Sequence, residues 1–232
     1  MSEPTAEPAA EPTAAVRPAS VLIVDDDRWT TRAVAAALRE SGSFDVLDPQ
    51  HSGEAGVEAF ARLRPSLVLM DVNMPPGMSG VDATKEIIAL EPKATIVLLT
   101  TVSPGPGLAR ALEAGATAAV NKSASDAELV RVAEAALDGD SPVLLRSLAD
   151  DILISGDTVA DVPSQAPVLT EMEHTVLIEV CEGRDYSEIA ERHFITMHTV
   201  KSHARNLRIK LGAKNLAQVV VRAIQYKFYS PE

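Results

Sequence analysis

Polar residues that follow short apolar runs could assemble a site for phosphoryl chemistry. Asp25 and Asp26 follow VLIV, Asp71 follows SLVLM, Thr100 follows TIVLL, and Lys122 lies two residues past TAAV. Three carboxylates in one cleft repel one another unless a divalent cation neutralises them, and an all-oxygen set suits Mg²⁺. A carboxylate beside such a metal, faced by an ammonium and a hydroxyl group, can attack a phosphoryl group in line. We therefore predict a Mg²⁺ site in which Asp71 is the nucleophile.

The apolar runs are short enough to be strands, and amphipathic stretches separate them. Strands are expected at 21–24, 44–47, 66–70, 95–99 and 117–120, and helices at about 29–41, 53–63, 80–90, 107–114 and 125–138. Because strand and helix alternate five times, we predict an α/β fold with a parallel sheet covered on both faces. Open parallel sheets build their sites at the carboxyl ends of the strands, where all five polar residues should converge.

The ordered set of motifs over residues 20–139 resembles the receiver domain of response regulators. It comprises Asp-Asp after the first strand, LVLMDVNMP around Asp71, LLTT after the fourth strand and NK after the fifth. The resemblance implies a flavodoxin-like (βα)5 fold with a five-stranded parallel sheet and phosphotransfer from a sensor histidine kinase. The residue roles that it implies are phosphoacceptor for Asp71, Mg²⁺ ligands for Asp25, Asp26, Asp71 and the backbone carbonyl of Asn73, switch hydroxyl for Thr100, and phosphate partner for Lys122.

Three features depart from the family pattern. Members of the family usually carry an aromatic residue three positions before the lysine that corresponds to Lys122, and this chain has Ala119 there. The usual switch pairs that aromatic residue with the hydroxyl group at Thr100, so its aromatic half is missing. The loop MPPGMSG after Asp71 is one residue longer than the common version, and TVSPGPG follows the fourth strand where acids and an aromatic residue are commoner. Both loops border the signalling face, so the departures concern how phosphorylation is read out.

Beyond residue 169 the strand pattern ends, and four helices fit at about 170–182, 186–193, 197–211 and 215–227. Thr196 is expected to cap the third of them. Within that helix Val200, Ala204, Leu207 and Leu211 form one apolar stripe, which we expect to face the core. Its opposite face carries polar and cationic residues, the kind of surface that a recognition helix inserts in the major groove. The exposed face is expected to comprise His198, Ser202, Arg205 and Ile209, flanked by Lys201, Arg208 and Asn206.

Charge is distributed unevenly along the chain. The net charge is −12, yet residues 192–227 hold eight Lys or Arg and no acid, whereas residues 169–191 hold seven acids and one Arg. A helix that is merely solvated normally mixes the two signs. The segregation of basic residues therefore favours binding to double-stranded DNA.

The segments LTEME, EIA, TVKSH and KLG closely resemble the LuxR-type helix-turn-helix over residues 169 to about 227. Together with a receiver domain, this resemblance implies the NarL/FixJ class of response regulators, with promoter DNA and RNA polymerase as partners and a homodimer joined through the last helix. Glu173 is expected to tie helices together, and Glu171 and Met172 replace the usual Pro-Arg. The resemblance implies DNA contacts from Lys201, Ser202 and Arg205 to base edges, and from Thr199, His203, Asn206 and Lys210 to phosphates.

The remaining segments complete the domain organisation. Residues 1–19, rich in Pro, Ala, Glu and Thr, are expected to be a disordered arm, and residues 140–168 a linker with one helical stretch. Residues 169–232 form the predicted all-α four-helix domain. The chain has 232 residues, one cysteine (Cys181, expected in the core) and no run of about 20 apolar residues, so we expect a cytoplasmic protein without membrane spans or disulfides.

Two other functions compete with a phosphorylated transcription regulator. The first is a phosphatase or phosphotransferase that uses Asp71 on external substrates in a Mg²⁺ site. A haloacid-dehalogenase-like enzyme of this kind would need a nucleophile after the first strand and a second aspartate two residues further on. Here Asp25 to Asp27 run contiguously and no insertion is large enough for a substrate cap, so we expect no enzyme. The second alternative is a phosphorylation-independent regulator whose receiver responds to a ligand or partner. If the chain is a phosphorylated transcription regulator, we expect the unphosphorylated receiver to cover either the DNA-binding helix or its dimer face.

Overall fold

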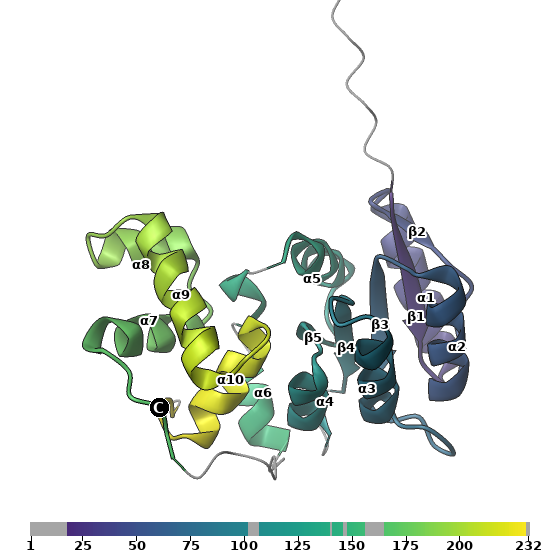
Figure 1. The fold of residues 1–232 in the computed structure, drawn as a ribbon. Helices are drawn as coiled ribbons and strands as arrows, with labels where there is room; N and C mark the ends of the chain where they lie inside the picture. The colour runs from purple at the N-terminus through teal and green to yellow at the C-terminus, as the bar shows by residue number, and fades with distance from the viewer. Residues whose placement is uncertain (1–17, 102–106, 140, 146–147, 156–164, 231–232) are drawn as a thin grey trace, which may run out of the picture.

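The computed structural model describes residues 18–101, 107–139, 141–145, 148–155 and 165–230. A domain built on a sheet is followed by two short helices and then by a helical domain (Figure 1). The arm predicted over residues 1–19 lies almost wholly outside the described residues, as does most of the TVSPGPG loop. Among the helices in the described ranges, none has the length and apolar character required to cross a membrane.

Five parallel strands form the sheet of the N-terminal domain in the order β2-β1-β3-β4-β5. They are β1 (Ala19–Val24), β2 (Phe44–Val46), β3 (Leu67–Asp71), β4 (Ile96–Thr100) and β5 (Ala118–Asn121). This strand order is that of the flavodoxin-like fold, so the predicted fold class is confirmed. Strands β3 and β4 are buried throughout, which explains why their sequences are uninterrupted apolar runs.

Helices cover both faces of this sheet. They are α1 (Arg28–Glu40), α2 (Gly53–Leu63), α3 (Gly80–Leu90), α4 (Leu108–Ala114) and α5 (Asp126–Asp138). Alternate strand residues enter different cores: Leu22 and Met70 pack with α2, α3 and α4, whereas Ile23 and Leu69 pack with α1 and α5. All five helices lie within one residue of the predicted positions.

The C-terminal domain consists of four helices, α7 (Glu171–Cys181), α8 (Tyr186–Arg192), α9 (Met197–Leu211) and α10 (Leu216–Gln225). Thr196 caps α9, as predicted, because its hydroxyl accepts a hydrogen bond from the backbone N–H of Thr199 at 3.1 Å. Cys181 is buried. The predicted apolar stripe on α9 is also confirmed, since all four of its members are buried: Val200, Ala204, Leu207 and Leu211.

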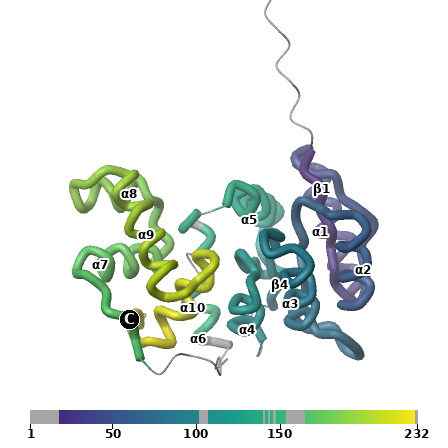
Figure 2. The backbone as a smooth tube through the Cα atoms, viewed as in Figure 1, coloured from purple at the N-terminus to yellow at the C-terminus, as the bar shows by residue number. Residues whose placement is uncertain are grey.

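Two short helices, η1 (Pro142–Leu145) and α6 (Leu148–Ser155), lie in the segment predicted as a linker. Leu145 and Ile152 are buried in them, and α6 contacts both α4 and α10. Figure 2 shows α6 and α10 lying between the sheet domain and helices α7 and α9. The apolar cluster on the α2–α4 side of the sheet therefore continues without a break into the C-terminal domain.

Candidate functional site

The carboxyl ends of the strands bring the predicted phosphoryl-transfer residues into one cleft. The Lys122 ammonium lies 2.8 Å from an Asp25 carboxylate oxygen and 3.1 Å from an Asp71 carboxylate oxygen. Asp25 and Asp71 are buried, whereas Asp26 is exposed at the mouth of the cleft. The buried Thr100 hydroxyl donates a hydrogen bond to the Val120 carbonyl at 3.4 Å. A lysine thus bridges two carboxylates in a cleft that Thr100 also lines.

Burial and charge set the ionisation of this cleft. Burial, followed by repulsion from Asp25, raises the pKa of Asp71 to about 6, although Lys122 opposes the change. Burial alone would lower the pKa of Lys122, but its hydrogen bonds and ion pairs with Asp25 and Asp71 outweigh burial and raise it. At neutral pH the site therefore holds an ionised Asp71 and a charged Lys122.

The donor set of the cleft fits a hard divalent cation. One carboxylate oxygen from each of Asp25, Asp26 and Asp71 lies within 4.8 Å of the others. Asn73 lines the same cleft, so its backbone is close to the three acids. Lys122 supplies a single positive charge to this cluster, which leaves excess negative charge for a cation to neutralise. An all-oxygen arrangement of this kind suits Mg²⁺.

Two contacts that the sequence did not reveal shape the loop after Asp71. A Cβ atom on Gly80 would lie 1.8 Å from the Asp71 carbonyl oxygen, so glycine lets α3 begin directly against the end of β3. The Glu54 carboxylate accepts a hydrogen bond from the backbone N–H of Met78 at 2.8 Å and thereby fixes the long MPPGMSG loop to α2. Glu54 and Met78 are 24 positions apart in the sequence, and no helix or strand periodicity connects the residues of either pair.

Most of the predicted DNA-contacting residues form one exposed surface on α9. Lys201, Ser202, Arg205 and Asn206 are exposed, and Thr199 and His203 are half-buried. The Thr199 hydroxyl shares a hydrogen bond with that of Thr196 at 2.8 Å. We call the side chains of Lys201, Ser202, Arg205 and Asn206 the α9 face.

Lys210 is placed differently from the rest of the predicted DNA-contacting set. Its ammonium lies 2.7 Å from the Glu173 carboxylate and also donates to the Val168 carbonyl at 3.1 Å. Glu173 is buried, and the hydrogen bond from Lys210 lowers its pKa. The prediction that Glu173 ties helices together is confirmed, because it joins α7 to α9. Lys210 would have to leave this pair in order to reach a phosphate.

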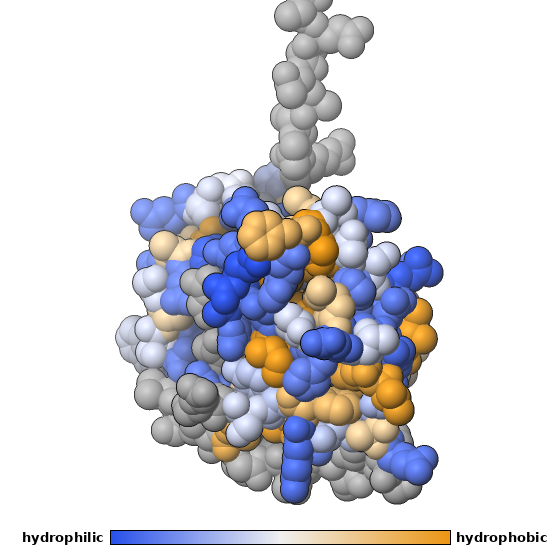
Figure 3. All heavy atoms as spheres, turned by 90° about the vertical axis from the view of Figure 1, so that its left-hand side faces the viewer, coloured by the Kyte–Doolittle hydropathy of each residue, from blue (hydrophilic) through white to orange (hydrophobic). Residues whose placement is uncertain are grey.

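The C-terminal domain presents a largely hydrophilic exterior. Figure 3 shows this side of the molecule, where polar residues predominate and apolar residues are scattered among them. Large apolar side chains on this domain include the exposed Phe194, Met197 and Ile209. Ile209 was predicted to lie on the exposed side of α9, and the structure places it there.

The two domains are joined by polar contacts between the end of α4 and α10, which we call the seam (Glu113–Ala116 with Asn215–Arg222). The Arg222 guanidinium makes two hydrogen bonds with the Glu113 carboxylate, at 3.1 and 3.0 Å. Asn215 donates to the Gly115 and Ala116 carbonyls at 3.2 and 3.0 Å. Gln218 donates to the Glu113 carbonyl at 2.7 Å. Side chains of α10 thus satisfy carbonyl groups that the end of α4 leaves without helical partners.

Comparisons with known proteins agree with both halves of this arrangement. Residues 21–134 match the response regulator receiver domain, and residues 167–223 match the bacterial regulatory proteins of the luxR family. The chain is 32% identical over 207 residues to the transcriptional regulatory protein LiaR of Bacillus subtilis, covering 88% of this chain and 95% of LiaR. It is 30% identical over 214 residues to the transcriptional regulatory protein LnrK of the same organism, covering 89% and 96% respectively.

The receiver also resembles a solved structure, the signal receiver domain of NarL from Mycobacterium tuberculosis. That match has a TM-score of 0.50 and 25% identity, and it covers 53% of this chain and 99% of the solved one. Receiver domains imply a histidine kinase as partner, and luxR-type domains imply DNA binding. The chain belongs to the NarL/FixJ class of two-component response regulators, with a receiver domain followed by a LuxR-type helix-turn-helix domain.

Proposed function

We propose that a sensor histidine kinase phosphorylates Asp71 and that the phosphorylated chain binds promoter DNA as a dimer, where it acts on transcription by RNA polymerase. The observation that carries this proposal is the Lys122 ammonium held between the carboxylates of Asp25 and Asp71. The Lys122 ammonium offsets part of the negative charge around Asp71, which lines the cleft together with Thr100.

The cleft already holds the nucleophile and the positive charge that phosphoryl transfer needs, in Asp71 and Lys122. An Asp71 carboxylate oxygen attacks phosphorus, and the bond from phosphorus to the donor's imidazole nitrogen breaks with its electron pair going to the imidazole. Lys122 offsets the charge that reaches the cleft. Asp25, Asp26, Asp71 and the carbonyl of Asn73 would hold Mg²⁺, which when bound supplies further neutralisation of the phosphoryl oxygens.

Readout begins at Thr100 and reaches the seam through α4. After phosphorylation, we expect the Thr100 hydroxyl to leave the Val120 carbonyl and donate to a phosphoryl oxygen. Leu108, the first residue of α4, lines the same cleft, and Glu113 near its other end holds Arg222. A shift of this short helix would therefore connect a change in the cleft with the Glu113–Arg222 pair. This route does not require an aromatic residue at position 119.

The arrangement of the domains favours one of the two modes of inhibition that the sequence left open. The α9 face is exposed, whereas α10 packs against α4 and α6. Because α10 is the expected dimer helix of this class, we propose that the unphosphorylated receiver prevents pairing of two C-terminal domains while leaving the recognition surface uncovered. Phosphorylation would then free α10, and two chains would pair on an inverted repeat.

The first prediction concerns the dependence of Mg²⁺ binding on pH. Because the pKa of Asp71 is raised to about 6, a proton competes with the metal there as the pH falls through this value. We expect the Kd for Mg²⁺ to be about tenfold higher at pH 5 than at pH 7. Trp29 is the single tryptophan and lies in the first turn of α1, three residues after Asp26, so its fluorescence should report binding.

The matched control is Asp71→Asn, which keeps the shape of the side chain and removes its titration. Its Kd for Mg²⁺ should be higher overall and should change less between pH 5 and 7. An equally steep pH dependence in this variant would show that Asp71 is not the group that competes with the metal.

The second prediction concerns the seam. Glu113→Ala removes the acceptor of two Arg222 hydrogen bonds and leaves the interior of the C-terminal domain untouched. We expect the unphosphorylated variant to dimerise and bind DNA about tenfold more tightly than the unphosphorylated wild type, because truncating one partner of a half-buried charge pair weakens the docked form. Gel shift and sedimentation would measure the two effects.

Arg222→Ala and the double variant complete a cycle that isolates the pair. If the Glu113–Arg222 pair holds the domains together, each single variant should raise basal DNA affinity. The increase in the double variant should then be close to that of either single variant and smaller than the sum of the two. Arg131→Ala, which removes an exposed arginine on α5, outside the seam, should leave basal DNA binding unchanged. Unaltered basal binding in Glu113→Ala would contradict this role of the pair.

The proposed function as a whole is tested by selecting DNA sites for the full chain and measuring its affinity for them with and without Mg²⁺ and acetyl phosphate. We expect the phosphodonor to raise affinity by at least about tenfold. Phosphoryl uptake without any change in DNA binding would favour the phosphorylation-independent regulator.

A further inference from the structure

The segment that carries Asn73 runs from the end of β3 to the start of α3 and includes the loop that is one residue longer than the common version. At the base of this segment, the backbone N–H of Gly80 donates a hydrogen bond to the Val72 carbonyl at 3.0 Å. Val72 and Met74 are buried on either side of the exposed Asn73. Residues 75–77 are all exposed, so the outer part of the loop depends on contacts with another element to hold its position.

The first residues of α2 supply those contacts. The Glu54 carboxylate accepts the hydrogen bond from the backbone N–H of Met78 at 2.8 Å. A Cβ atom on Gly53 would lie 2.5 Å from the Met78 carbonyl oxygen, so glycine lets the loop lie directly against the start of the helix. Ser52 caps α2 by accepting a hydrogen bond from the backbone N–H of Ala55 at 3.2 Å, which fixes the turn that carries Glu54. The outer part of the loop is therefore anchored to a capped helix end.

The residues just before α2 are joined to the other ligand-bearing segment of the cleft. The Gln50 carbonyl accepts a hydrogen bond from the backbone N–H of Asp25 at 3.0 Å. The His51 Nδ1 atom lies 3.0 Å from the Asp25 carbonyl oxygen, and it is the donor because a carbonyl group only accepts. One short stretch of chain, residues 50–54, therefore contacts the backbone of Asp25 on one side and the loop that follows Asn73 on the other.

We propose that residues 50–54 act as a clamp that fixes the two ligand-bearing segments of the cleft relative to each other, with Glu54 as a positioning residue for Mg²⁺ binding. Octahedral coordination of Mg²⁺ tolerates little error in the positions of its ligands, so ligands from two segments must be held at a fixed separation. A long loop has more conformations to lose when a metal binds, and a clamp that is already formed removes them beforehand. This inference rests on the Mg²⁺ site of the proposed function and adds the residues that prepare it.

The test measures the Kd for Mg²⁺ of the full chain at pH 7, followed through the fluorescence of Trp29. Glu54→Ala removes the acceptor of the Met78 N–H, and its Kd should rise by about tenfold, the lower end of the effect of groups that orient metal ligands. Glu54→Gln loses the charge but keeps an oxygen acceptor, so its Kd should stay close to that of the wild type. Glu58→Ala removes the same charge from an exposed position one turn further along α2 and should leave the Kd unchanged.

A second variant tests whether the clamp joins the two segments. His51→Ala removes the contact with the Asp25 carbonyl, on the opposite side of the clamp from Met78, and should also raise the Kd. Because either substitution separates the segments, a variant with both His51→Ala and Glu54→Ala should bind Mg²⁺ about as weakly as the weaker single variant. Losses of binding free energy that add in the double variant would show two independent contacts and would overturn the clamp.

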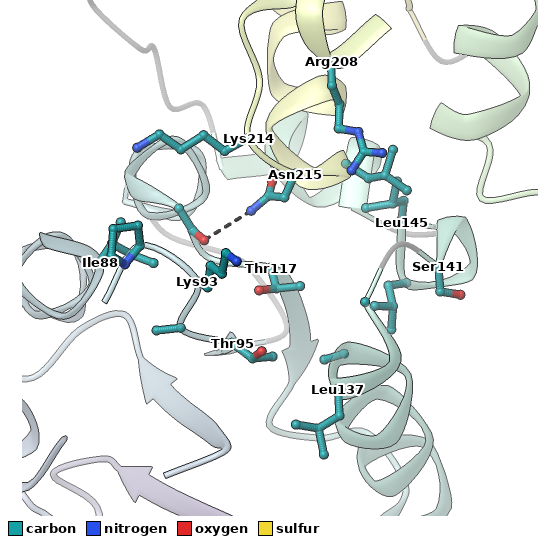
Figure 4. A pocket seen from close by; sticks show the side chains of 17 residues that line it. Ile88, Lys93, Thr95, Thr117, Leu137, Ser141, Leu145, Arg208, Lys214 and Asn215 are labelled. Atoms are coloured by element: carbon teal, nitrogen blue, oxygen red, sulfur yellow. Dashed lines mark hydrogen bonds between the residues drawn. The ribbon is translucent and has the colours of Figure 1, made fainter. Parts of the chain in front are cut away.

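The clamp is separate from the seam between the domains. Figure 4 shows the Asn215 amide at the seam, directed at a carbonyl group just after α4, whereas the clamp lies at the start of α2. Basal DNA binding by unphosphorylated Glu54→Ala should therefore equal that of the wild type. A rise in basal DNA binding would overturn the proposal, because the substitution would then act on docking of the domains rather than on the cleft.

An unchanged Kd in Glu54→Ala, or an equal rise in Glu54→Gln, would overturn Glu54 as a positioning residue, because its hydrogen bond to the loop would then have no effect on the metal. A wild type that binds no Mg²⁺ would overturn the clamp together with the metal site. Failure of the proposed function alone would be seen differently: the wild type would bind Mg²⁺ more tightly than Glu54→Ala and yet take up no phosphoryl group from acetyl phosphate.

Discussion

The Asp71→Ala variant will gain no phosphoryl group on incubation with Mg²⁺ and acetyl phosphate, whereas the wild type will gain one per chain. The expected effect is complete loss, because the substitution removes the attacking oxygen itself. Asp25 cannot replace it, since Asp25 is fully buried and paired with Lys122. Intact-mass measurement on both proteins in parallel reads the result directly.

The control for this experiment is Asp27→Asn, which lies next to the acid cluster. Asp27 caps α1 by accepting a hydrogen bond from the backbone N–H of Trp29, and asparagine preserves such a cap. This variant should take up one phosphoryl group like the wild type. Uptake by Asp71→Ala would instead point to the exposed Asp26 as acceptor, and absence of uptake by every protein would favour the phosphorylation-independent regulator.

Arg205→Ala should weaken binding to selected DNA about 10- to 100-fold under activating conditions, because a good contact from arginine to a base edge contributes about 1–3 kcal/mol. Arg205 lies in the middle of the α9 face, is exposed, and projects from a helix whose opposite side is locked in the core. The loss should be largest on the preferred site and small on unrelated DNA, as gel shifts with the two DNAs would show.

Lys227→Ala provides the matched comparison, since it removes one positive charge from the same domain outside α9. It should reduce affinity for both DNAs slightly and equally. Equal losses from Lys227→Ala and Arg205→Ala on both DNAs would mean that Arg205 contributes only charge. In that case the recognition surface would lie elsewhere on the domain.

Local sequence patterns predicted the elements and the cleft because both depend on short-range periodicity. Apolar runs of strand length placed β3 and β4, and their carboxyl ends then located Asp71 and Thr100. The stripe through Val200 and Leu207 likewise identified which side of α9 faces the core. In each case the residues that decide the structure lie within a few positions of one another.

Contacts between distant segments could not be predicted in the same way. Arg222 and Glu113 are separated by 109 positions, and nothing near either residue indicates its partner. Lys210 was assigned to phosphate by resemblance, whereas its ammonium pairs with Glu173 from another helix. The segment 140–168 looked like a linker because its ends are polar, yet the apolar residues of η1 and α6 pack into the core. All three features, namely the two ion pairs and the packing of η1 and α6, depend on contacts between segments that are distant in the sequence. Local composition does not indicate such contacts.

Asn215 performs two tasks with one amide group. Its oxygen accepts a hydrogen bond from the backbone N–H of Gln218 at 2.9 Å and starts α10, while its nitrogen donates to the carbonyls that end α4 in the other domain. Aspartate starts helices equally well but has no hydrogen to donate when ionised. A single exchange of nitrogen for oxygen would therefore preserve the fold and alter only the strength of docking. Evolution could adjust the signal threshold of such a regulator at this position without touching its phosphorylation chemistry or its reading of DNA.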